Sequence, residues 1–119
     1  MKLAVLVKNN QVSDPLEADK LVIIGEKGIE NTKTLPPDQK GLSKLLTAAL
    51  WAKQQKTKTI TLKRIGPEGY KTLKELEINI IIYKGTIHQL QKHLKKKTKL
   101  KLATQKEIDP NCPCCKPPA

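Results

Sequence analysis

The stretch TLKRIGPEGYKTLKELEINIIIYKGT, residues 61–86, contains two apolar runs that are separated by a helical pattern. The first run, residues 59–62, is short enough to be a strand. Pro67 suits the first position of a helix, where no backbone N–H is required. The β-branched run at residues 78–82 indicates a strand buried on both faces, and Thr86 can cap a further helix with Gln89, three residues on, as its capping-box partner. Because a strand–helix–strand unit makes a right-handed crossover, the stretch predicts two parallel strands with helices packed on them.

Three further apolar runs lie before this stretch, at residues 2–7, 21–24 and 29–35. Short turns join them, so we expect these strands to be antiparallel. Residues 38–55 have a helical period, with Asp38 as the expected N-cap. The expected buried stripe of this helix consists of Leu42, Leu45, Leu46, Ala49 and Leu50. We therefore predict a single α/β domain, in which helices pack on a mixed five-stranded sheet.

The 119 residues include 23 Lys and Arg against 11 Asp and Glu, which gives a formal net charge of +12. This excess favours anionic partners, although lysines that only solubilise the surface would give the same count. No apolar run reaches the roughly 18 residues that span a membrane, and the N-terminus lacks the features of a signal peptide. We therefore expect a cytoplasmic protein without a membrane partner.

Positive charge and glycine stand where the predicted parallel strands end and the next elements begin. Ligands of such sheets bind at the carboxyl edge of the parallel strands. Helix N-termini offer free backbone N–H groups to anions, and glycine lets a ligand approach the backbone. The alternative interpretation is ordinary turn and cap chemistry, with lysines as solvent cover. The predicted anion cradle consists of Lys8, Lys63, Arg64, Gly66, Lys84, Gly85 and Thr86.

The sequence offers little for catalysis. It has no Walker A, G-x-G-x-x-G or H-E-x-x-H motif, and no evident nucleophile–base pair. His88 and His93 do not share a helix face, so we expect surface residues rather than a pair of metal ligands. These observations predict a binding protein and not an enzyme.

Three pieces of sequence, in their order and spacing, make the chain similar to a known family. They are MKLAVLV at residues 1–7, VS at residues 12–13, and IGPEGYKTLKELEINIIIYKGTIHQLQKHL at residues 65–94. The chain resembles the dinitrogenase iron–molybdenum cofactor biosynthesis family, the NifX/NifB-type domains with a ribonuclease H-like fold. The resemblance implies a domain of this type over residues 1–104, and we expect residues 105–119 to form a flexible tail.

The resemblance also implies a function. Such a protein would bind or carry an iron–sulfur or iron–molybdenum-type cluster, whose negative charge suits the cradle, for donor and acceptor proteins that stay unknown. Many family members have a His-Phe pair just after the Val-Ser, and that His is a candidate cluster ligand. This chain has Pro15 and Leu16 there, and Lys63 and Arg64 where members often have glycines.

The tail contributes a second candidate site, because Cys112, Cys114 and Cys115 place three thiols close together. Thiolates suit soft metals and iron–sulfur clusters. A fourth ligand would have to come from a His, a second chain or the cluster itself. A redox-active pair and an incidental tail are the alternatives.

A nucleic-acid-binding module is the alternative function. A run of lysines begins in the last predicted helix and continues beyond it, and phosphate contacts supply most non-specific affinity for nucleic acid. Against this reading, the chain has one Trp, two Tyr and no Phe, so it lacks stacking platforms for bases. The lysines of the run are Lys92, Lys95, Lys96, Lys97, Lys99 and Lys101.

Overall fold

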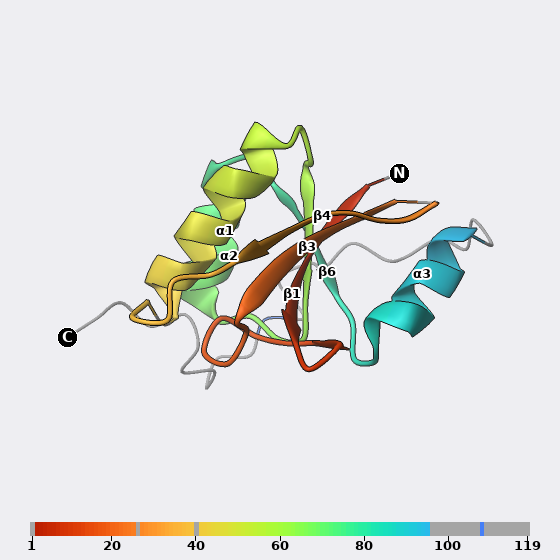
Figure 1. Ribbon diagram of the computed structural model, residues 1–119. Coiled ribbons are helices and arrows are strands. Elements are labelled where there is room, and N and C mark those ends of the chain that lie inside the picture. The colour runs from red at the N-terminus through yellow and green to blue at the C-terminus, as the bar shows by residue number, and fades with distance from the viewer. Residues whose placement is uncertain (1, 26, 40, 96–107, 109–119) are drawn as a thin grey trace.

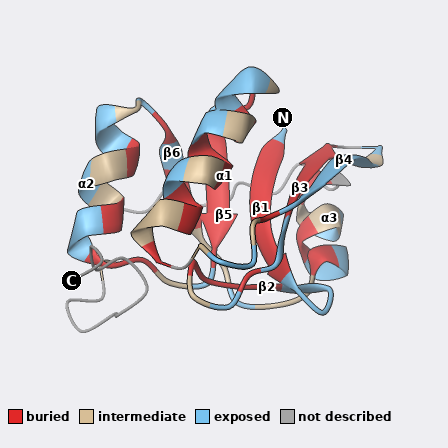
Figure 2. Cartoon of the chain, turned by 60° about the vertical axis from the view of Figure 1, so that its left-hand side comes forward, coloured by how far each residue is buried: buried red, intermediate tan, exposed pale blue. Residues whose placement is uncertain are grey.

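A mixed sheet forms the centre of the computed structural model, which describes residues 2–25, 27–39, 41–95 and 108. Within these residues the sheet has six strands in the order β4-β3-β1-β5-β6, and β2 pairs with β1. The strands are β1 (Leu3–Lys8), β2 (Gln11–Val12), β3 (Lys20–Gly25), β4 (Gly28–Thr34), β5 (Thr59–Leu62) and β6 (Asn79–Ile82). In Figure 2 the inner strands are buried, whereas β4 at the edge is exposed along most of its length.

The sheet is antiparallel on one side of β1 and parallel on the other. β1 pairs with β3, and β3 with β4, in antiparallel register. β5 runs parallel to both β1 and β6, and Leu62 lies opposite Ile82 at the end of the β5–β6 ladder. The α/β domain, the antiparallel early strands and the parallel later strands are therefore confirmed. The ribonuclease H-like assignment stays a prediction.

Three helices cover the two faces of the sheet within the described residues (Figure 1). Helices α1 (Leu42–Gln54) and α2 (Pro67–Glu75) pack on one face, and α3 (Ile87–Lys95) packs on the other. The faces differ because successive strand residues point to opposite sides. In β1, Leu6 contributes to the α1–α2 side and Val5 to the α3 side.

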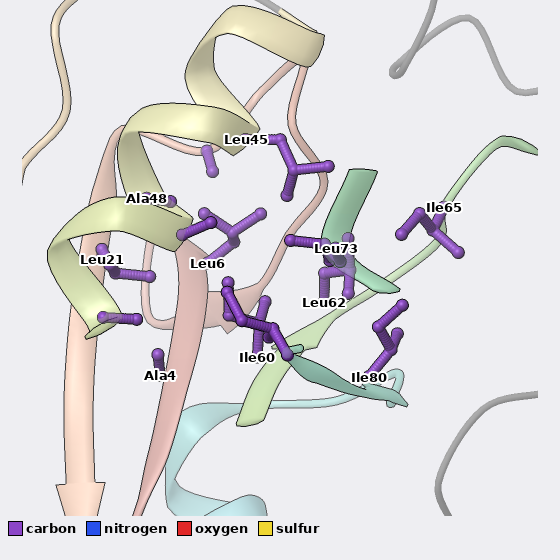
Figure 3. Close-up of a cluster of buried hydrophobic side chains, with 14 of the residues drawn as sticks. Ala4, Leu6, Leu21, Leu45, Ala48, Ile60, Leu62, Ile65, Leu73 and Ile80 are labelled. Atoms are coloured by element: carbon purple, nitrogen blue, oxygen red, sulfur yellow. The ribbon is translucent and has the colours of Figure 1, made fainter. Parts of the chain in front are cut away.

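The larger core lies between the sheet and helices α1 and α2. Figure 3 shows Leu45 and Ala48 of α1 facing Leu6 and Leu21 of the sheet. Leu73 of α2 belongs to the same fully buried cluster. Burial of one such side chain contributes about 1.5–3 kcal/mol, so this layer fixes the positions of the ends of β1 and β5.

Helix α1 differs from its prediction at its start and along its buried face. It begins at Leu42 instead of Asp38, because Gly41 has a positive φ of 65° and ends the preceding turn. Leu45 and Ala49 are fully buried as predicted, but Leu46 and Leu50 are 37% and 53% exposed, so the predicted stripe was wrong at those two positions. Alanines on the true inner face let the helix approach the sheet closely. The buried residues of α1 are Lys44, Leu45, Ala48, Ala49 and Ala52.

Strand β2 is not among the five strands expected from the sequence. Asn9 and Asn10 have φ values of 52° and 64°, which suits a tight two-residue hairpin turn. The chain therefore folds back at once and pairs Val7 with Val12. This hairpin brings the segment after Val12 to the carboxyl edge of the sheet. The expected tail lies outside the described residues, apart from residue 108.

Candidate anion-binding site at the carboxyl edge of the sheet

The structure places the basic residues of the cradle at one edge of the sheet. Lys8 is the last residue of β1, Lys63 follows β5 directly, and Lys84 lies shortly after β6. Because these strands are parallel, their carboxyl ends share an edge. The three lysines are exposed, and Arg64 is half-buried. The placement predicted from the sequence is correct for this set.

The connections after β5 and β6 leave the sheet in opposite directions. The chain goes from β5 into α2 on one face, and from β6 into α3 on the other (Figure 1). Open α/β sheets bind ligands at such a point of divergence. We call the carboxyl ends of β5 and β6, with Lys63, Arg64 and Lys84, the switch point.

A short segment after β2 separates Lys8 from the switch point. The Ser13 N–H donates to Leu6 O at 2.7 Å, and Ser13 O accepts from the Lys63 N–H at 2.8 Å. Ser13 is thus inserted between β1 and β5 where their direct pairing stops. The predicted single cradle is therefore divided, with Lys8 on one side of this segment and Lys63 on the other.

Asp14 is a buried carboxylate that the sequence reading did not use. Its Oδ1 accepts the N–H groups of Leu16 and Glu17, both at 3.0 Å. Its Oδ2 accepts the Arg64 Nε–H at 2.9 Å, and the two side chains are 5% and 39% exposed. Arg64 is therefore held in place by a partner 50 residues away instead of standing alone. An Asp-Pro pair is typical of such a turn, but the partner carries no local signal.

The β6–α3 junction uses its backbone donors internally. Thr86 N–H donates to Gln89 Oε1 at 3.0 Å, and Gln89 N–H donates to Thr86 Oγ1 at 3.1 Å, which confirms the predicted capping box. The Ile87 N–H donates to Asn10 O at 3.0 Å. The expectation that the start of α3 directs these amides at an anion was therefore wrong, because the protein already satisfies them.

Gly85 has a structural explanation of its own. A Cβ at this position would lie 2.5 Å from Gln89 Oε1 and 3.0 Å from the Tyr83 ring, so a larger residue would have to displace the Gln89 side chain from the capping box. Its carbonyl accepts the Val12 N–H at 2.9 Å. Gly85 and Thr86 thus shape the junction, and this geometry gives no evidence that they contact a ligand.

The β5–α2 junction is built differently. Gly66 is the N-cap with φ −93° and ψ 174°, an extended conformation, and as a glycine it contributes no side-chain cap of its own. Pro67 occupies the first helical turn as predicted. Gly66 is buried, and its carbonyl accepts the Tyr70 N–H at 3.0 Å. This helix start lies three residues after Arg64, with Ile65 and Gly66 between them.

The chemistry of the described part of the edge is cationic. Within residues 2–25, 27–39, 41–95 and 108, no group of three or more His, Cys, Asp or Glu could hold a metal ion. The candidate thiols Cys112, Cys114 and Cys115 lie outside the described residues. The switch point can therefore attract an anion by charge and by donors.

Lys8 lies instead in a separate cleft. This cleft has a volume of about 550 Å³, and its lining includes Lys8 and Lys44. Lys44 belongs to the first turn of α1 and is only 5% exposed. The sequence reading missed Lys44, because it assigned the inner face of α1 to leucines.

No protein-family model and no curated protein matches the chain. Among the described residues, no helix is both long and apolar enough to cross a membrane.

Solved structures do match. A crystal structure from Methanocaldococcus jannaschii, described as a "putative dinitrogenase", is 17% identical with a TM-score of 0.61, over 87% of this chain and 95% of that one. The crystal structure of the protein PH0822 is 20% identical with a TM-score of 0.64, over 88% and 96%. An NMR structure from Thermotoga of a "putative NifB protein" of the DUF35 family is 16% identical with a TM-score of 0.52, over 85% and 91%. The chain shares the α/β fold of these three proteins across most of its length.

Proposed function

We propose that the protein is a non-enzymatic binding protein of the dinitrogenase cofactor biosynthesis family, with an anionic iron–sulfur or iron–molybdenum-type cluster as its cargo. The observation that carries this proposal is the switch point, where Lys63, Arg64 and Lys84 gather at the ends of two parallel strands. Two of the structures that share the fold are described as a "putative dinitrogenase" and a "putative NifB protein", which supports the choice of cargo.

Arg64 is the central residue of the proposed site. Asp14 holds its Nε, which fixes the plane of the guanidinium, and the side chain is still 39% exposed. A fixed guanidinium can offer two parallel donors to an anion, whereas Lys63 and Lys84 act as point charges. The negative charge of Asp14 offsets part of the positive potential at the switch point, and this limits how strongly the site attracts an anion.

Direct ligation of iron would have to come from the tail. The described residues offer no group of three metal-ligating side chains, whereas Cys112, Cys114 and Cys115 are soft ligands that suit iron. We therefore assign two roles to the chain: the switch point attracts the cargo by charge, and the thiols bind its metal.

The charge role is tested with a paired set of lysine variants. The test variant is Lys63→Gln with Lys84→Gln. The control is Lys58→Gln with Lys92→Gln, because Lys58 is an exposed lysine that directly precedes β5 at the opposite edge. Both variants lose the same net charge. The probe is tetrathiomolybdate, a stable sulfide-rich anion, and the measurement is anaerobic titration calorimetry.

The expected loss of affinity is about tenfold in the test variant and less than about twofold in the control, since each partly exposed contact contributes about 0.5–1 kcal/mol. Equal losses would mean a diffuse basic surface. That result would remove the proposed site and favour the nucleic-acid alternative, for which binding should be sequence-blind and steeply salt-dependent.

The thiol role is tested separately. Cys112→Ser, Cys114→Ser and Cys115→Ser are combined in the full chain, and iron and sulfide are counted after anaerobic reconstitution. We expect the variant to lose most of its bound iron and to keep its melting temperature. Undiminished iron in the variant would exclude the thiols as ligands and leave the charge role intact.

A further inference from the structure

A cleft runs along the solvent-facing side of α2, the helix that begins three residues after Arg64. Its volume of about 680 Å³ falls within the roughly 300–1,000 Å³ that is usual for binding pockets. The α2 residues of its lining follow the spacing i, i+3, i+4, i+7 and i+8, so they form one stripe along the whole helix. These residues are Pro67, Tyr70, Lys71, Lys74 and Glu75.

Ile108 completes the lining of this cleft. Among residues 96–119 it is the one whose position the structure describes, and it is partly buried. Removal of isoleucine surface from water is favourable, so a position against α2 holds this part of the chain in place. Residues 109–119 continue directly from Ile108, and their path therefore starts at the cleft.

The composition of residues 109–119 suits this cleft. The segment DPNCPCCKPPA contains four prolines, and proline-rich chains favour the extended polyproline II conformation. Such chains bind grooves lined by aromatic side chains, because they lose little conformational entropy on binding. Tyr70 offers that surface. It is partly buried, it packs against the larger core, and Lys74 Nζ lies 5.8 Å from its ring centroid. Pro67 adds exposed apolar surface on the same stripe.

We propose that the cleft along α2 is the docking site of the chain's own C-terminal segment, residues 109–119, with Ile108 as the anchor and the cysteines toward the Pro67 end. The nine residues of α2 span about 13 Å, which corresponds to about four residues of polyproline II chain. Four residues also separate Ile108 from Cys112. Glu75 repels thiolates from the far end of the helix, whereas the positive end of the helix dipole attracts them.

Docking gives the thiols a defined place beside the switch point. Pro67 follows Arg64 by three residues, so thiols at this end of α2 and the cations of the switch point act on one anion. This consequence rests on the proposed function, because it matters only if the thiols and the switch point share a cargo. Docking itself depends on no cargo, and it is tested without one.

A segment that is tethered at Ile108 but does not dock is the competing explanation. Its cysteines would sample positions all around their point of attachment, and the Pro67 end of α2 would not be favoured over the Glu75 end. The two explanations therefore differ in where a probe attached to Cys112 is found.

The experiment is a measurement of paramagnetic relaxation enhancement by NMR in the full chain without iron. Because the chain has three cysteines, Cys114→Ser and Cys115→Ser leave Cys112 as the single thiol, which then carries a nitroxide label. We expect strong broadening of the amide signals of residues 68–71 and weaker broadening at residues 73–75. Residues 87–95 of α3 should broaden little, since α3 packs on the other face of the sheet. Equal broadening at residues 68–71 and 87–95, or stronger broadening at residues 73–75 than at 68–71, would overturn the proposal.

Ile108→Ser tests the anchor in the labelled chain, and Ile108→Val is the matched control, because valine keeps most of the apolar surface. The serine variant should reduce the broadening rate at residues 68–71 at least about threefold, since it removes buried hydrocarbon from the cleft. The valine variant should keep most of the broadening. Unchanged broadening in folded Ile108→Ser would overturn the role of Ile108. If the serine variant does not fold, the broadening pattern of the labelled parent still decides whether the segment docks.

This test and the iron test of the proposed function fail separately. If residues 68–71 broaden as expected but the variant without cysteines keeps its iron, the segment docks and the thiol role is wrong. If that variant loses its iron but residues 68–71 are not preferred, the thiols bind iron and the docking proposal is overturned.

Discussion

The β5–α2 and β6–α3 junctions resemble each other in sequence, since in each a basic residue is followed within two residues by glycine and then by a helix start. They differ in which groups accept hydrogen bonds from the backbone N–H groups at the helix start. At β6–α3 a capping box and Asn10 O take the amides of Thr86, Ile87 and Gln89. At β5–α2 the N-cap is Gly66, which has no side chain of its own to cap the helix. The adjacent Arg64 is bound instead by the buried carboxylate of Asp14.

The difference shows that a recurring sequence pattern does not imply a recurring site. The β6–α3 junction satisfies its amides with a local capping box and with the carbonyl of Asn10, whereas the β5–α2 junction has the Asp14–Arg64 ion pair and keeps cationic surface exposed. If this comparison is correct, substitutions at the two junctions should have effects on stability that differ in size and in physical cause.

The largest effect should come from Asp14→Ala at the β5–α2 side. The substitution removes the acceptor of two backbone N–H groups and of the Arg64 Nε–H. Groups left without partners in a mostly buried site typically cost 1–3 kcal/mol each, so the expected loss of stability is about 2–4 kcal/mol, reduced by the partial exposure of Arg64. Urea denaturation measures it.

Asp14→Asn serves as the control for the charge. Its amide oxygen can still accept the N–H groups of Leu16 and Glu17, so the loss should be about half that of Asp14→Ala. Arg64→Ala should cost about 1 kcal/mol, since the pair is partly exposed. If Asp14→Ala costs no more than Arg64→Ala, the turn at residues 14–18 is not held by Asp14, and the contrast between the junctions fails.

A smaller effect is expected from Thr86→Ala at the β6–α3 side. The substitution removes the side-chain oxygen that accepts the Gln89 N–H, and such caps contribute about 1 kcal/mol. Gln89→Ala, which removes the other half of the box, should cost less. Neither should alter the affinity for tetrathiomolybdate. A change in that affinity without a change in melting temperature would show that this junction contacts the anion after all.

The fold could be predicted largely from the sequence, because its signals are local. Continuous apolar runs identify the inner strands, and the Thr86–Gln89 spacing identifies the start of α3. The inner face of α1 could not be predicted in the same way. Leucines and alanines occur on more than one face of that helix, so the pattern alone does not identify the buried face. Packing against the sheet decides that Leu50 is exposed and Ala49 is buried.

The site could be predicted only in part. Parallel strands must bring Lys63 and Lys84 to one edge, so their shared position follows from topology. The pairing of Asp14 with Arg64 and of Lys44 with Ala18 O joins residues far apart in the chain, and neither leaves a periodic signal. Long-range polar contacts therefore decide which of the basic residues act together.

The smallest effect, and one of opposite sign, should come from Thr61→Val in β5. Thr61 lies opposite Ile81 of β6, and both residues are buried, at 0% and 1% exposed. Among the described residues the Thr61 hydroxyl has no hydrogen-bond partner. Valine has nearly the same shape without the hydroxyl, so the substitution should raise stability by up to about 1 kcal/mol.

Ile81→Val should instead cost about 0.5–1.5 kcal/mol, because it only removes buried hydrocarbon. Thermal denaturation of the two variants compares the strands at matched positions. If Thr61→Val lowers stability, the hydroxyl has a partner in the folded protein, and the end of β5 has a polar requirement that β6 lacks.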